Sequence, residues 1–218
     1  MTNKLKPSRI ALAIGTTLSL GAAHAAEVGF IDGTTATLQA RNYYFSRDFS
    51  DIVGPNQQSK AQEWAQGFIL DVRSGYTEGT VGFGVDVLGQ LGFKLDSGVS
   101  RVNTGLLPTG SDGNAVDDFG RIGAALKARL SKTELKIGEL TPNLPVLTFS
   151  DIRLLPPTYQ GASLVSQEID GLTVLAGQFR SASVLNDAGD GKMRAKLGHV
   201  PQLGGYAETD RFNYAGAD

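Results

Sequence analysis

The chain has 218 residues, of which 28 are glycine, 8 are proline and none is cysteine. The absence of cysteine excludes disulfides and thiolate metal sites. The two histidines, His24 and His199, nearly exclude a histidine metal site as well. With 22 acidic against 20 basic residues, the slightly negative balance argues against a nucleic-acid partner.

Residues 1–25 predict a secretory signal peptide. The segment begins with three basic residues, continues with an uncharged run of apolar and small residues, and ends on an A-x-A cleavage site at 23–25. A buried helix or an uncleaved anchor is the alternative, although the apolar run is short for a membrane span. We therefore expect one mature domain over 26–218, with 17 basic against 22 acidic residues, because the signal holds three basic and no acidic residues.

Beyond residue 26 no run approaches the ~20 apolar residues of a membrane helix. Instead, segments of about ten residues alternate apolar and polar side chains, which is typical of barrel strands. In the first segment, Leu38 and Tyr44 fall on one face and Arg41 and Arg47 on the other. The predicted strands are 37–47, 64–76, 80–91, 121–130, 133–140, 162–167 and 172–180, and an eighth begins near Glu208.

The connections between these strands are alternately short and long. Short turns and long loops at opposite ends are typical of an outer-membrane barrel. A β-sandwich also has many short strands, but it gives less reason for so strict an alternation. The short connections are 77–79, 131–132 and 168–171, and the long ones are 48–63, 92–120, 141–161 and 181–207. The sequence therefore predicts an all-β fold, an antiparallel transmembrane β-barrel of the bacterial outer membrane.

Five basic residues fall on the predicted inner faces, where water is available. An Arg or Lys on the lipid face would cost roughly 2–4 kcal/mol at the membrane midplane, so strand parity places these charges in the lumen. They are Arg41, Arg47, Arg73, Lys127 and Arg129. Such a row would lower the energy of an anion along its path and favours small anionic or zwitterionic solutes. The alternative is that the five pair with Asp71, Asp86 or Glu139 and only order the wall.

Three further features concern loops, aromatics and glycines. The connection 141–161 holds four prolines, which stiffen it, and is too apolar for a solvated loop, so we expect it to fold into the barrel interior. Aromatic residues near strand ends are expected to form interface girdles. Glycines on the third strand are expected to make room for a packed loop. The aromatics are Tyr43, Tyr44, Trp64 and Tyr76, and the glycines are Gly82, Gly84 and Gly89.

Several runs, in order along most of the mature chain, resemble the OprD family of outer-membrane porins. They are RNYYFSRD at 41–48, WAQGF at 64–68, SGYTEGTVGFGVDVLG at 74–89, GFKLD at 92–96, KARLSK at 127–132, KIGE at 136–139, Pro142, Pro145 with Val146, RLLP at 153–156, and Gly161. Family members are about twice this length. The resemblance implies a monomeric barrel of eighteen strands, of which about seven or eight lie in this N-terminal part.

The resemblance also implies a function. Porins of this family are substrate-selective channels through which small carboxylates or amino acids diffuse into the periplasm. Inward-folded loops narrow their lumen, and a ladder of basic residues guides a carboxylate. Because 141–161 resembles the constriction loop, Asp151 and Arg153 become candidates for substrate contact. The alternative for Arg153 is that it anchors the loop to the wall.

No enzyme is predicted, and we assign no catalytic residue, cofactor or metal. Once the signal is cleaved His199 is the only histidine, and no acid or serine stands at a meaningful spacing from it. The expected partners are the solutes and outer-membrane lipid. Two other functions stay open at this point: a structural or adhesive outer-membrane barrel without transport, and a soluble secreted β-protein.

Overall fold

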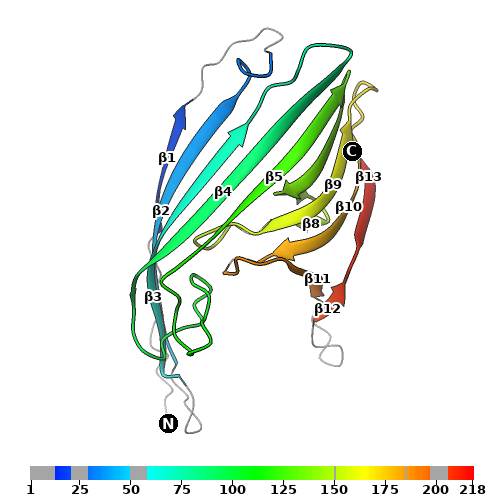
Figure 1. The fold of residues 1–218 in the computed structure, drawn as a ribbon. Coiled ribbons are helices and arrows are strands. Elements are labelled where there is room, and N and C mark those ends of the chain that lie inside the picture. Colours follow the sequence, from blue (N-terminus) through cyan, green and yellow to red (C-terminus); the bar gives the residue numbers. More distant parts are fainter. Residues whose placement is uncertain (1–12, 21–28, 50–57, 150, 185, 197–205) are drawn as a thin grey trace.

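A computed structural model describes residues 13–20, 29–49, 58–149, 151–184, 186–196 and 206–218 of the chain. Within these ranges, no helix has the length and apolar character needed to cross a membrane. The described elements are strands, and all but two of them form one curved, open sheet with the outline of a trough (Figure 1).

Every strand pair in the sheet is antiparallel. The strands are β1 Ala13–Leu20, β2 Thr35–Asp48, β3 Lys60–Arg73, β4 Val81–Ser97, β5 Asp118–Leu130, β6 Thr133–Leu140, β9 Thr158–Ser166, β10 Val174–Ser183, β11 Gly191–Lys196, β12 Tyr206–Thr209 and β13 Phe212–Ala217. Neighbours in the sheet follow the order β1-β2-β3-β4-β5-β6-β9-β10-β11-β12, and β13 pairs with β10. A separate small hairpin of β7 Asn143–Leu144 and β8 Leu147–Thr148 lies in the connection between β6 and β9.

The seven predicted strands are confirmed, and the region near Glu208 forms β12 and β13. The prediction of one long connection over 181–207 is wrong, because β11 lies within it and pairs with the end of β10. Strand β4 continues to Ser97, six residues past the predicted end, since its apolar–polar alternation continues through the glycines.

Strand β1 was not predicted. It lies inside the expected signal peptide and pairs with β2 over its whole length. An unpaired strand edge offers N–H and C=O groups to any extended segment. The rest of the expected signal peptide, 1–12 and 21–25, lies outside the described residues, so its cleavage stays a prediction.

The outer face of the sheet is apolar and exposed. Ile122 and Leu126 on β5 are 80% and 70% exposed, which suits a surface that contacts lipid. Tyr44 and Trp64 are cross-strand partners on this face, as the girdle prediction requires. The prediction is wrong for Tyr43 and Tyr76. Tyr43 has the opposite parity to Tyr44, and Tyr76 follows the end of β3, where strand parity no longer applies.

The concave face carries an apolar core made by two loops packed on the wall. Leu106 and Leu107 of loop 98–117 and Leu154 and Leu155 of loop 141–157 have no exposed surface. They pack against wall residues of β3 and β5, among them Ala65, Ile69 and Phe119. The connection between β6 and β9 therefore folds inward, as predicted. We call 141–157 the constriction loop after the role that the resemblance implies for it.

Glycines on the wall make room for these packed segments, though not all are the ones predicted. Gly67 and Gly92 are cross-strand partners. A Cβ at Gly67 would lie 3.0 Å from Leu154 Cγ, and one at Gly92 would lie 3.0 Å from Leu154 Cδ2. Gly84 does face a packed segment, since its Cβ would lie 2.8 Å from Ser74 Oγ.

Of the other two predicted glycines, Gly82 also faces a packed segment, and its Cβ would lie 2.9 Å from Tyr76 Cβ. The expectation is wrong for Gly89. A Cβ there would meet nothing closer than Leu70 Cβ at 3.9 Å, because Gly89 belongs to the outward-facing parity of β4.

The short turn between β5 and β6 is hydrogen-bonded to the short turn between β9 and β10. Glu168, between β9 and β10, accepts hydrogen bonds from Ser131 Oγ, Lys132 N and Thr133 Oγ1, each at 2.9 Å. The hydrogen bonds from the Ser131 and Thr133 hydroxyls lower the pKa of the Glu168 carboxyl. Lys132 also pairs with Asp170 at 3.1 Å. The turn joining β5 to β6 is thus held against the next turn along the sheet.

Candidate solute path

Arg41, on the inner face of β2, holds the constriction loop. Its guanidinium forms a two-pronged ion pair with the Asp151 carboxylate, with NH2 to Oδ2 at 2.9 Å, and NH1 also donates to the Arg153 carbonyl at 3.3 Å. Nε and NH2 donate to Gln39 Oε1 at 2.9 and 2.7 Å. Two of the predicted site residues, Arg41 and Asp151, are therefore brought together, and each neutralises the other.

Arg153 belongs to the same loop. Its Nε donates to the Thr104 carbonyl at 3.2 Å, so it connects the constriction loop to loop 98–117. Its guanidinium carbon lies 5.2 Å from the centre of the Phe45 ring, and that of Arg47 lies 5.4 Å from the same ring. Within the described residues neither Arg47 nor Arg153 has a carboxylate at ion-pair distance.

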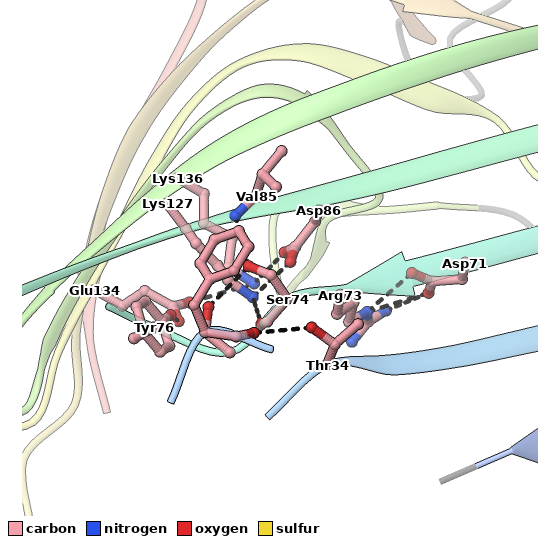
Figure 2. Close-up of polar contacts among 12 residues, drawn as sticks. Thr34, Asp71, Arg73, Ser74, Tyr76, Val85, Asp86, Lys127, Glu134 and Lys136 are labelled. Atoms are coloured by element: carbon pink, nitrogen blue, oxygen red, sulfur yellow. Dashed lines mark hydrogen bonds and ion pairs between the residues drawn. The ribbon is translucent and has the colours of Figure 1, made fainter. Parts of the chain in front are cut away.

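A second cluster lies on the inner face near the short turns (Figure 2). Lys127 is only 6% exposed, and its ammonium donates to Asp86 Oδ1 at 2.5 Å and to the Ser74 carbonyl at 2.7 Å. Lys136 reaches the other oxygen of Asp86 at 3.3 Å and Glu134 Oε1 at 3.4 Å. A buried lysine needs such partners, because an unpaired charge would be costly there.

Tyr76 extends into this cluster from the turn after β3. Its hydroxyl donates to Glu134 Oε2, and its ring lies under two cations, Lys127 Nζ at 5.0 Å and the Arg129 guanidinium at 4.3 Å. Arg73 forms an ion pair with Asp71 at 2.7 Å, visible beside the cluster in Figure 2. In the described part of the chain, Arg129 has no carboxylate at ion-pair distance.

The five predicted lumen cations thus separate into two groups. Arg41, Arg73 and Lys127 are neutralised by carboxylates, the arrangement expected of residues that order the wall. Arg47 and Arg129, together with Arg153 of the loop, are held by aromatic rings or backbone carbonyls.

The acid Glu139, another expected partner, accepts a hydrogen bond from the Thr158 hydroxyl. Gly138 precedes it with a φ of 135°, a conformation that only glycine adopts easily. The irregular backbone at Gly138 brings Glu139 against Gly123 on the inner face of β5, where a Cβ would lie 2.4 Å from Glu139 Cγ.

Arg121 is a site residue that the sequence interpretation missed. It stands at the start of β5, and its side chain contacts Gln90 of β4 and carbonyls of two different loops. The strand alternation could have identified it, because residue 121 has the same parity as Lys127 and Arg129.

A hollow of about 360 Å³ opens between the second cluster and the beginning of the constriction loop. Its charged lining includes Arg73 and Lys136 as well as Asp86 and Glu134, and Phe179 adds to an apolar side. Both signs of charge beside an apolar surface suit a small solute with polar and apolar parts.

Comparison with known proteins agrees with this architecture. The protein-family model described as outer membrane porin, OprD family, matches residues 28–218 of the chain. The chain belongs to the OprD family of outer-membrane porins. This OprD-family chain is 47% identical over 192 residues to porin-like protein GalP of Pseudomonas putida, an alignment that covers 87% of this chain and 44% of GalP.

Two solved porins of Pseudomonas aeruginosa are similar to this OprD-family chain. OccK9 (OpdG) is 50% identical, with a TM-score of 0.78, over 87% of this chain and 47% of that one. OpdK, whose structure was determined with vanillate, is 45% identical, with a TM-score of 0.74, over 87% and 46%. The chain spans a little under half the length of these relatives. The family is a family of channels of the outer membrane, and the sheet described above is a part of such a barrel.

Proposed function

We propose that this chain is the N-terminal part of a monomeric, substrate-selective porin, through which small carboxylates or amino acids diffuse across the outer membrane into the periplasm. The observation that carries the proposal is that three arginines, Arg47 and Arg129 of the wall and Arg153 of the loop, have no carboxylate at ion-pair distance among the described residues. We further propose that residues 1–25 are a cleaved signal and that 26–218 contribute to the barrel.

Physical reasoning supports an anionic solute. A carboxylate that enters a narrow lumen loses part of its hydration, and cations along the wall compensate for that loss. Cations already paired with acids contribute little net potential, so Arg47, Arg129 and Arg153 carry the proposed attraction. OpdK was crystallised with vanillate, which is itself a carboxylate. The acidic residues around the hollow, Asp86 and Glu134, are already paired with Lys127 and Lys136, so by the same reasoning they add little attraction for an ammonium group.

The proposal is tested by Arg153→Ala in the complete porin, reconstituted in planar bilayers and in liposomes. The matched control is Arg101→Ala, which removes the same charge from an exposed loop position whose side chain, within the described ranges, donates only to Gln62 Oε1. We expect Arg153→Ala to weaken carboxylate uptake and anion selectivity severalfold while the barrel assembles normally. Selectivity equal to that of the control would refute the role of Arg153. A parent porin without conductance would favour a non-transporting barrel.

A further inference from the structure

Arg121 occupies an unusual place at the inner face of β5, between two loops. Its NH2 donates to the Pro156 carbonyl of the constriction loop. Its NH1 donates to the carbonyls of Val184 at 3.0 Å and Asp187 at 2.7 Å, which belong to the connection 184–190 between β10 and β11. Its Nε donates to Gln90 Oε1 at 2.6 Å. One side chain therefore contacts the wall and both loops.

The acceptors are backbone carbonyls in irregular segments. Such carbonyls have no ladder partner and must be satisfied by side chains or water. Arginine suits this role, because its planar guanidinium holds five donors in fixed directions, whereas lysine has one compact ammonium. Within the described residues no carboxylate lies at ion-pair distance from Arg121. Its hydrogen bonds to the loops are therefore not in competition with an ion pair.

The wall residue beside Arg121 supports the same arrangement. Gln90 is only 4% exposed, and its amide nitrogen donates to the same Pro156 carbonyl at 3.2 Å. Its other amide atom accepts from Arg121, so Gln90 fixes both the guanidinium and the loop backbone. Further hydrogen bonds hold the connection 184–190 to other parts of the sheet and loops. Asp190 accepts from Gln160 at 2.5 Å, and Asn186 donates to Leu107 O at 3.5 Å.

Among the side chains that the structure describes, only that of Arg121 hydrogen-bonds to both loops. We propose that Arg121 is a positioning residue that joins the constriction loop to the connection 184–190, so that the two move as one unit and together set the aperture of the pore. This inference rests on the proposed function, since an aperture matters only in a conducting barrel. Arg121 acts here through the loops and not by contact with the solute.

The test compares Arg121→Gln and Arg121→Lys with Arg129→Gln in the complete porin. Arg129 lies on the same strand and the same inner face, but among the described residues it donates to no loop carbonyl, so its change removes an equal charge and a contact with the Tyr76 ring without breaking a hydrogen bond to either loop. We expect both Arg121 variants to show conductance sub-levels and raised open-channel noise. Arg129→Gln should keep a single steady level with altered anion selectivity. Lysine should fail to restore steadiness, because its three donors radiate from a single nitrogen and cannot reproduce the fixed spacing of the guanidinium donors.

Hydrogen exchange of the folded porin gives a second, conductance-independent measurement. In Arg121→Gln the amides of Leu154 and Leu155, which precede the two prolines of the constriction loop, and those around 186–190 should exchange faster together. The expected rise is about tenfold or more, since a hydrogen bond to a charged group contributes about that factor. Steady current and unchanged exchange in Arg121→Gln would overturn the inference, as would faster exchange in only one loop. Absence of conductance in the parent porin would instead count against the proposed function.

Discussion

The packing of Leu154 against the wall predicts how firmly the constriction loop is held. Leu154 is fully buried beside Gly67 and Phe119. Truncation of a buried leucine to alanine costs about 2–5 kcal/mol, because apolar contacts are lost and a cavity remains. In the variant Leu154→Ala, this cost shifts the equilibrium between the docked and undocked loop by about 30-fold to several-thousand-fold. Ile152 in the same loop is 58% exposed, so Ile152→Ala should shift it little.

Single-channel recording of the complete porin detects this shift. We expect Leu154→Ala to show frequent transitions to a higher conductance, since an undocked loop leaves the lumen wider, and Ile152→Ala to keep the parent current. Trypsin adds a chemical measurement, because Arg153 becomes accessible when the loop leaves the wall. If the two variants have equal current and equal cleavage at Arg153, the loop is not held by the buried leucine and the reasoning fails.

Two further predictions concern buried and exposed carboxylates. Glu63 has no exposed surface and accepts from the Thr104 hydroxyl and Leu107 N. Glu63→Ala should therefore cost about 1–3 kcal/mol for each group left unpaired and speed tryptic cleavage after Arg101 at least fivefold. An unchanged cleavage rate would mean that apolar contacts alone hold loop 98–117.

The pKa of Glu168 is lowered from its ordinary value of 4.5. The hydrogen bonds that the Glu168 carboxylate accepts from residues 131–133 should persist above pH 4.5. They should weaken as the pH falls through the lowered pKa of the folded state. The protection factor of the neighbouring Lys132 amide should follow this fall in the parent and be independent of pH in Glu168→Gln. A fall of equal size in both proteins would contradict the assignment.

Strand parity explains which parts of the site could be predicted. Alternation in a regular strand fixes the face of a residue, and it placed Arg41, Arg73 and Lys127 correctly on the inner wall. It also contained the information for Arg121, which lies on the same face. Parity does not reveal partners. That Arg41 pairs with Asp151, more than 100 residues later, follows from the inward fold of the loop and not from any local pattern.

The incorrect predictions lie where regular backbone ends. Tyr76 follows β3 by three residues, in a turn whose backbone bends inward, so extension of the strand pattern assigned it to the wrong face. Glu139 follows a glycine with positive φ that interrupts the regular strand, and it meets Thr158 rather than one of the five predicted cations. Residues 191–196 form β11 because the end of β10 offers them a free edge, a long-range event without a local signature.

The paired glycines of β3 and β4 determine how closely the constriction loop approaches the wall, independently of any charged residue. Because Gly67 and Gly92 carry no side chain, Leu154 sits almost on the backbone of the sheet. A methyl group at Gly67 would displace the loop by a few tenths of an ångström toward the pore axis, since the Cβ would lie 3.0 Å from Leu154 Cγ. The width of the passage can thus be adjusted from behind the loop, in small steps, with every arginine of the wall left in place.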